Sequence, residues 1–162
     1  MLLLFVVSLF VYFYLIKSDQ TAVPALSQRG GAEAFQKCLG GEREDILILA
    51  LNSLCSWCRA SYPFYRKIIE QVESSRAPLS VIASVDTSSS VTVQQIHLEA
   101  AGVFADSVVA CPFLSADISR VPTVIHFDNH GSVKNIWTGF LGDAQQKELL
   151  GSIDQLNAQP SD

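Results

Sequence analysis

The stretch Ile46-Leu47-Ile48-Leu49-Ala50-Leu51, followed after three residues by Cys55-Ser56-Trp57-Cys58, decides the fold that we expect for this chain. The apolar run predicts a buried strand, and the residues after the second cysteine have the spacing of a helix. Two intervening residues let the two sulfur atoms meet across one helical turn, so a disulfide between them can open and close without unfolding. Cys55 and Cys58 are therefore candidates for reversible thiol chemistry.

The position of each cysteine predicts its task. The thiolate is the nucleophile in thiol chemistry, and the N-terminus of a helix favours an anion through its unpaired N–H groups and partial positive charge. Cys55 is expected at that N-terminus. Cys58, nearly one turn further in, is expected to be more buried and to attack the mixed disulfide that Cys55 forms with a substrate.

A lone CxxC pair has two other interpretations, a structural zinc site and a disulfide without redox turnover. His126 and His130 offer a second pair of ligands with the internal spacing of a zinc finger. Compact fingers, however, separate their pairs by roughly 12 to 20 residues. The separation here is much longer, and His126 falls in a strand-like run. A static disulfide stays open as an alternative, although so short a loop stabilises little.

A second landmark is Pro122, at the mouth of the apolar run 123–127, because proline is tolerated in strands only at a first position or an edge. The segments after it read as a turn, a strand, a glycine and a helix: 129–131, 132–137, Gly139 and 143–157. Together with the strand, CxxC and helix that precede them, these segments resemble the thioredoxin family over most of residues 33–157.

The resemblance implies roles for particular residues. Those that fall on family positions are the two cysteines of the CxxC, the helix-kinking proline, the cis-proline and the glycine after the last strand: Cys55, Cys58, Pro63, Pro122 and Gly139. In the family the bond before that proline is cis and the loop faces the cysteines. Val121 and Pro122 are therefore expected to form a platform for an extended substrate segment, with Trp57 near the same surface.

Two departures from thioredoxin bear on the chemistry. Ser56 and Trp57 replace its Gly-Pro between the cysteines, which leaves the direction of electron flow open. Leu49 stands where thioredoxin carries a buried acid, so that proton-transfer role has no obvious occupant. Glu44 and Asp45, at the start of the same run, are expected to be solvated charges rather than substitutes for that acid.

An insertion points to a subgroup. Between the expected strand Leu79–Val85 and Pro122 lie a helix-like segment, Val93–Ala101, and a short β-branched run, Ser107–Ala110. This arrangement resembles the TlpA-like membrane-tethered thioredoxins. The resemblance implies an α/β thioredoxin-like fold with an inserted helix and strand before the cis-proline. It also implies a thiol–disulfide oxidoreductase, often a reductase, that exchanges disulfides with proteins outside the cytoplasm, is recycled by a membrane redox partner and needs no metal or cofactor.

The N-terminus fits that picture independently. Leu2 to Ile16 is almost unbroken apolar sequence, and Lys17 marks its end. At about 1.5 Å per residue such a helix is short for a hydrocarbon core of roughly 30 Å, a mismatch that a thin bilayer absorbs. A cleaved signal peptide would need a basic start, which nothing before Leu2 provides. We expect residues 1–17 to be a single-pass transmembrane anchor, with a cleaved signal as the alternative, and residues 18–32 to be a linker.

Composition limits the remaining possibilities. Residues 33–157 suffice for one domain with its own core, and 158–162 read as a tail. A formal net charge of -5 argues against nucleic acid or an anionic lipid surface as a partner. We expect one long helix from Ser56 to about Ser74, kinked at Pro63, and a serine-rich loop over 84–90 that caps the next helix.

The remaining cysteines and histidines are ambiguous. Cys38 and Cys111 are a mutual disulfide, a second redox pair that relays electrons to the CxxC, or two separate thiols, and we assign neither a catalytic role. We expect His126 to be a core or sheet-face residue with its polar groups satisfied, His130 to lie in a turn and His97 on a helix surface. Copper chaperones on the same fold use two cysteines and a histidine, typically with CxxxC, so copper delivery is one alternative function. A binding module without turnover is another.

Overall fold

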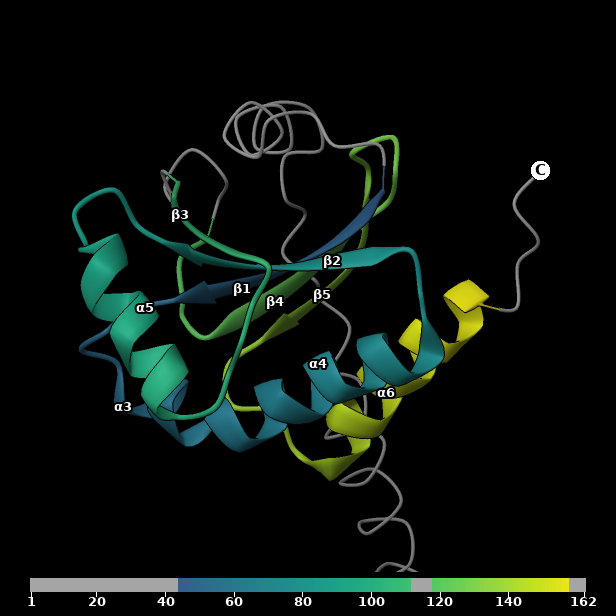
Figure 1. Ribbon diagram of the computed structural model, residues 1–162, viewed down its shortest axis with the longest axis horizontal. Coiled ribbons are helices and arrows are strands. Elements are labelled where there is room, and N and C mark those ends of the chain that lie inside the picture. Colours follow the sequence, from purple (N-terminus) through teal and green to yellow (C-terminus); the bar gives the residue numbers. More distant parts are fainter. Residues whose placement is uncertain (1–43, 112–117, 158–162) are drawn as a thin grey trace, which may run out of the picture.

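Strand β1 (Asp45–Leu51) is the centre of the computed structural model, which describes residues 44–111 and 118–157. These residues form one five-stranded sheet in the order β3-β2-β1-β4-β5 (Figure 1). The other elements, in chain order, are α3 (Ser56–Ala60), α4 (Tyr62–Ser75), β2 (Leu79–Val85), α5 (Val91–Ala100), β3 (Ser107–Ala110), β4 (Thr123–Phe127), β5 (Val133–Thr138) and α6 (Asp143–Asn157).

The apolar run of β1 is explained by its surroundings: a strand on each side and a buried cluster of side chains on each face. It pairs in parallel with β2 and antiparallel with β4, so both of its edges are occupied. Leu47, Leu49 and Leu51 belong to one buried cluster, whereas Ile46 and Ile48 belong to another on the opposite face. A strand that is buried on both faces needs an apolar residue at every position, which confirms the expected central strand.

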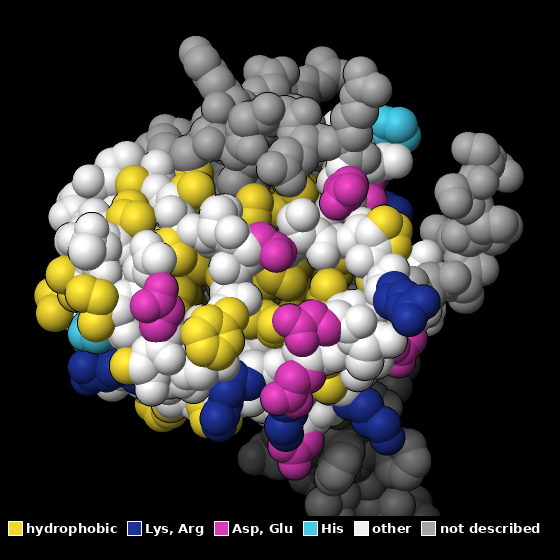
Figure 2. All heavy atoms as spheres, viewed as in Figure 1, with side chains coloured by type: hydrophobic (Ala, Val, Ile, Leu, Met, Phe, Trp, Pro, Cys, Tyr) yellow, Lys and Arg dark blue, Asp and Glu magenta, His cyan; other side chains and the backbone are white. Residues whose placement is uncertain are grey.

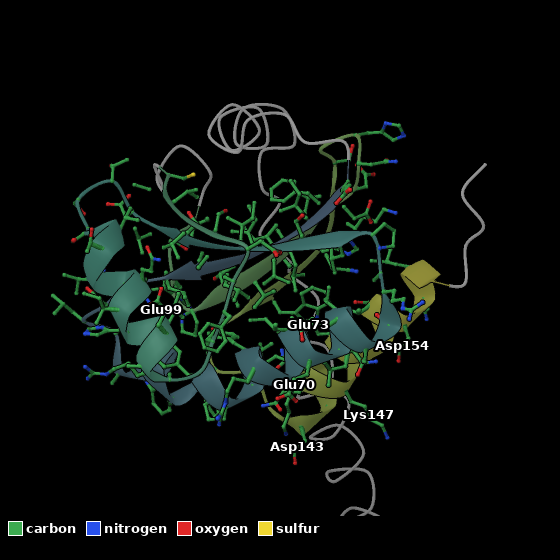
Figure 3. All side chains as sticks on the ribbon, viewed as in Figure 1. Glu70, Glu73, Glu99, Asp143, Lys147 and Asp154 are labelled. Atoms are coloured by element: carbon green, nitrogen blue, oxygen red, sulfur yellow. The ribbon has the colours of Figure 1, made fainter. Side chains whose placement is uncertain are left out.

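Helices α4 and α6 lie side by side against the first of these faces (Figure 1). The side chains that they bury there include Tyr65, Ile68, Leu149 and Ile153. Their outer surfaces carry exposed charges, among which Figure 3 labels Glu70 and Glu73 on α4 and Lys147 and Asp154 on α6.

The long helix expected from Ser56 to about Ser74 is two helices. α3 ends at Ala60, and α4 begins at Tyr62, with Ser61 as the cap between them. Pro63 therefore lies in the first turn of α4, where its missing N–H breaks no helical hydrogen bond. The expectation of a kink at Pro63 inside one helix is wrong, because the interruption falls two residues earlier.

The expected insertion is present as α5 and β3, between β2 and β4. Ser90 caps α5 by accepting a hydrogen bond from the N–H of Val93 at 3.3 Å, as predicted for the serine-rich loop. β3 then pairs in parallel with β2 at the edge of the sheet, and α5 contacts β3 at the same end of the molecule (Figure 1).

Several expectations concern residues outside the described ranges. These are the membrane anchor at 1–17, the linker at 18–32, Cys38, and the tail at 158–162. Within residues 44–111 and 118–157, the helices are all too short or too polar to cross a membrane.

Candidate active site

The two cysteines lie where β1 gives way to helix. Cys55 is the N-cap of α3, and its backbone N–H donates to the carbonyl of Asn52 at 3.0 Å, which closes the turn out of the strand. Its sulfur accepts a hydrogen bond from the N–H of Cys58 at 3.2 Å. An N–H group that points at a sulfur stabilises negative charge on it, which is the arrangement a nucleophilic thiolate requires.

The two thiols differ in access. Both are free; Cys55 is half-buried, whereas Cys58 is 0% exposed. Burial, followed by the hydrogen bond with Cys55, raises the pKa of the Cys58 thiol to about 12. Cys55 is therefore the sulfur that a substrate can reach, and Cys58 is held protonated behind it.

A loop from a distant part of the sequence completes the site. The Val121–Pro122 peptide bond is cis, as predicted, and the Cys55 thiol donates to the carbonyl of Val121 at 3.7 Å. The carbonyl of Pro122 in turn accepts from the N–H of Gly139 at 2.7 Å. The fold thus brings Val121 and Pro122 next to Cys55, although Val121 is 66 positions further along the chain than that cysteine.

Trp57 stands on the outer side of the site. Its side chain is 62% exposed, and its ring contacts that of Phe140 with the centroids 5.6 Å apart and the planes tilted by 51°. Sequence reasoning did not identify Phe140, or Leu54 beside the motif, as part of the site. The sequence did offer a signal: Phe140 directly follows Gly139, and Leu54 directly precedes Cys55. Both fall in expected loops, where a large apolar side chain is seldom buried in the core.

The position on β1 where thioredoxin carries a buried acid is apolar in this chain. Leu49 is fully buried, so no carboxylate occupies that place on β1. A buried polar contact links α5 to α4, where the amide nitrogen of Gln94 donates to the hydroxyl of Tyr62 at 3.1 Å. Burial raises the pKa of Tyr62, which keeps this hydroxyl neutral at physiological pH.

Cys111 differs from the active-site pair. It is buried and disulfide-bonded, so the interpretation of Cys38 and Cys111 as two separate thiols is wrong for Cys111. Its side chain belongs to the core cluster on one face of the sheet, and Cys58 belongs to the cluster on the other face. The sheet therefore separates Cys111 from the Cys58 sulfur, which argues against direct exchange between them.

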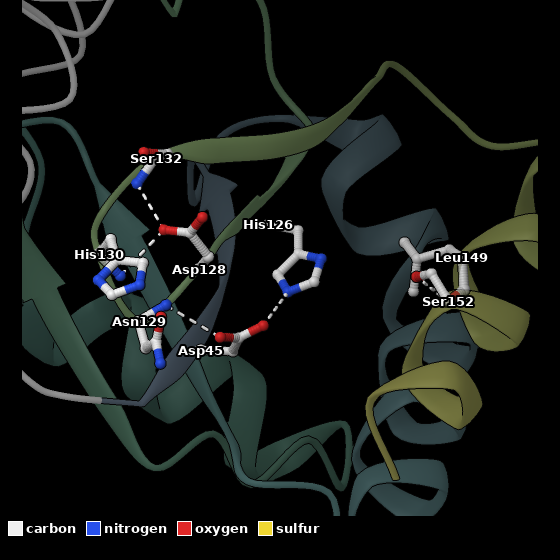
Figure 4. A network of polar contacts seen from close by, with 8 residues as sticks. All are labelled: Asp45, His126, Asp128, Asn129, His130, Ser132, Leu149 and Ser152. Carbon is white, nitrogen blue, oxygen red and sulfur yellow. Dashed lines mark hydrogen bonds and ion pairs between the residues drawn. The ribbon is translucent and has the colours of Figure 1, made fainter. Parts of the chain in front are cut away.

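His126 lies at the opposite end of the sheet and has a structural partner. Its Nε2 is 3.0 Å from Oδ2 of Asp45, and Oδ1 of Asp45 accepts from the N–H of Asn129 at 2.9 Å (Figure 4). The expectation of a core position for His126 is confirmed. The expectation that Asp45 is solvated is wrong, because its carboxylate is engaged on both oxygens.

The zinc and copper alternatives need a third or fourth ligand near the thiols. Within residues 44–111 and 118–157, histidine, cysteine and acidic side chains form no group of three or more that is suited to a metal ion. His130, as expected, lies in the turn between β4 and β5, at the same end as Asp45 (Figure 4).

Comparisons with known proteins bear on the fold. No family model matches the sequence, and no curated protein matches it. Among solved structures, a thiol-disulfide isomerase from Corynebacterium glutamicum superposes with a TM-score of 0.56 at 17% identity, over 70% of this chain and 82% of that one. The thioredoxin domain of a thiol-disulfide oxidoreductase from Bacteroides vulgatus gives 0.53 at 14% identity, over 71% and 83%.

A third similar structure is a secreted disulfide oxidoreductase from Mycobacterium tuberculosis, described as homologous to DsbE of E. coli. It has a TM-score of 0.54 at 10% identity, over 72% of this chain and 85% of that chain. At such identities the likeness concerns the fold. Together with the sheet order, it shows that this chain has a mixed α/β, thioredoxin-like fold.

Proposed function

We propose that this protein is a thiol–disulfide oxidoreductase that exchanges its Cys55–Cys58 dithiol for disulfides in protein substrates. The observation that carries the proposal is the pairing of a half-buried Cys55, 3.7 Å from the carbonyl of Val121, with a fully buried Cys58. One sulfur is accessible and accepts a hydrogen bond from an N–H group, and the other is buried. This division of roles is what disulfide exchange requires.

In the reducing direction, the Cys55 thiolate attacks one sulfur of a substrate disulfide. That S–S bond breaks, a mixed disulfide forms on Cys55, and the departing substrate sulfur takes up a proton. Cys58 then loses its proton and attacks the Cys55 sulfur, which releases the second substrate thiol and leaves a Cys55–Cys58 disulfide. The substrate gains two electrons, the protein loses two, and a dithiol donor must restore the reduced pair.

Trp57, Val121 and Pro122 have the role of holding the substrate during this exchange. Val121 and Pro122 are next to the reacting sulfur and are fixed through Gly139, while Trp57 is exposed beside it. An extended segment that lies along this loop would present its own sulfur to Cys55 without a large rearrangement of the protein.

The test is a pair of single substitutions. Cys55→Ala should abolish reduction of a protein disulfide, whereas Cys58→Ala should accumulate a substrate joined to Cys55, visible by mass spectrometry under non-reducing conditions. Retained turnover in the first variant, or no adduct in the second, would refute the assigned roles. A binding module without turnover predicts that ligand binding survives both substitutions and that neither variant forms an adduct.

We further propose that the protein acts as a reductase outside the cytoplasm, anchored by residues 1–17 and recharged by a membrane redox partner. The apolar run from Leu2 to Ile16 and the resemblance to TlpA-like proteins support this location, and one structurally similar protein is secreted. Labelling of intact cells with a membrane-impermeant thiol reagent should reach Cys55 if the proposal holds. Labelling only after lysis would contradict it.

A further inference from the structure

Exposed apolar side chains surround the accessible cysteine. In the described part of the chain six large apolar residues are exposed, and three of them lie in the CxxC segment or in the loop before α6: Leu54, at 88%, Trp57, at 62%, and Phe140, at 50%. Figure 2 shows hydrophobic side chains at the surface at the end of the molecule where α3 and α5 lie, with a few charged side chains among them, and many charged side chains over α4 and α6. Apolar groups that gather at a functional site commonly form a recognition surface.

Phe140 is held in its outward position by its neighbours. Gly139, with φ of +87°, donates its N–H to the carbonyl of Pro122 at 2.7 Å, and Leu141 on the other side is buried in the core. The ring between these two anchors rests against Trp57, with the centroids 5.6 Å apart. Tilted aromatic contacts of this kind are favourable, so the two rings support each other at the surface.

The contact between Trp57 and Phe140 brings the loop before α6 next to the CxxC segment. Trp57 belongs to the CxxC segment, and Phe140 belongs to the loop before α6. The preceding residue of that loop, Gly139, is hydrogen-bonded to Pro122, which lies beside Cys55. Leu54 immediately precedes Cys55. We call these three exposed side chains, Leu54, Trp57 and Phe140, the apolar rim.

We propose that the apolar rim selects protein substrates with a bulky apolar side chain next to the reactive cysteine. The proposal rests on the proposed function and names its substrate class. An aromatic or aliphatic side chain on the rim loses water contact together with Trp57 and Phe140, which is favourable. A charged side chain there would lose hydration without gaining a partner from any of the three rim residues, which is unfavourable.

Two peptide disulfides that differ only in the residue next to cysteine, Phe in one and Asp in the other, test this selection. The small disulfide bis(2-hydroxyethyl) disulfide serves as a substrate that does not reach the rim. With the full chain we expect kcat/KM to be about tenfold higher for the Phe peptide, which is in the range expected for one apolar contact. Phe140→Ser should remove most of that preference, and Phe140→Leu should keep part of it.

Phe104→Ser is the matched control, because Phe104 is 68% exposed and lies in the segment after α5, not in the active-site loops. It should keep the preference for the Phe peptide and reduce the small disulfide at the wild-type rate. Equal kcat/KM for the two peptides in the wild type, or an unchanged preference in Phe140→Ser, would overturn the proposal while leaving the proposed function intact. Failure of the wild type to reduce even the small disulfide would instead overturn the proposed function.

Discussion

The two ends of strand β1 serve different purposes. At its start, the carboxylate of Asp45 is engaged by His126 and by the backbone of Asn129, so that both oxygens have partners. At its far end, the chain turns into Cys55, whose free thiol is accessible, with large apolar side chains exposed around it. At the Asp45 end the polar groups are paired, whereas at the Cys55 end a reactive thiol is accessible and apolar side chains are exposed to solvent.

The difference shows how one short strand separates stability from reactivity. Buried polar groups that are fully paired hold a structure together, whereas exposed apolar groups and accessible thiols contribute little to it and are retained for interactions. Substitutions at the start of β1 should therefore change stability more than exchange, and substitutions at its end should do the reverse.

The largest effect is expected from Cys55→Ala. Loss of the only accessible nucleophile of the pair should lower disulfide reduction by about a thousandfold or more, measured with a protein disulfide and an excess of reduced protein. The same variant should change the free energy of unfolding by no more than about 1 kcal/mol, since the side chain is half-buried. A large loss of stability would mean that the thiol end also holds the fold together.

The next largest effect is the pH dependence of alkylation at Cys58. The pKa of Cys58 is raised to about 12 by burial, so the thiolate fraction of Cys58 grows about tenfold with each pH unit below that value. In the reduced protein, iodoacetamide should modify Cys55 first, and modification of Cys58 should accelerate roughly a hundredfold between pH 7 and pH 9. Peptide mass mapping over time checks this, and equal rates at both cysteines would contradict the assigned burial.

The smallest effect on exchange is expected from Asp45→Ala. It leaves the buried Nε2 of His126 and the N–H of Asn129 without their partner, and should lower the free energy of unfolding by about 1–3 kcal/mol. Glu44→Ala, at an exposed neighbour, is the control and should stay within about 0.5 kcal/mol of the wild type. Urea unfolding measures both. A rate of disulfide reduction that falls with Asp45→Ala in the folded protein would break the separation between the two ends.

Local patterns predicted much of this molecule. The strand Leu79–Val85 and the helix Asp143–Asn157 have the expected bounds, because alternation, apolar runs and turn residues act between near neighbours. The cis-proline and the exposed Trp57 followed from the resemblance to thioredoxins. The break between α3 and α4 at Ser61 could also have been predicted locally, because proline at position 63 favours the first turn of a helix over its interior.

The contacts that were missed join residues that are distant in the sequence. Asp45 and His126 are 81 positions apart, and Trp57 meets Phe140 only because β4 and β5 return the chain to the CxxC. No periodicity marks such a pair, since each partner taken alone reads as an ordinary strand-end charge, core histidine or loop aromatic. The fold must be known before their chemistry is visible.

The most direct test of the account is the redox equilibrium of the full chain against glutathione, read by differential alkylation and mass spectrometry. We expect a reversible two-electron couple at Cys55 and Cys58, near the reducing value of about -270 mV, while Cys111 stays oxidised throughout and the mass of its linked peptide identifies its partner. A value near -120 mV, typical of strong oxidants, would make the protein a disulfide donor instead of a reductase. The absence of any reversible couple at Cys55 and Cys58 would contradict the account itself.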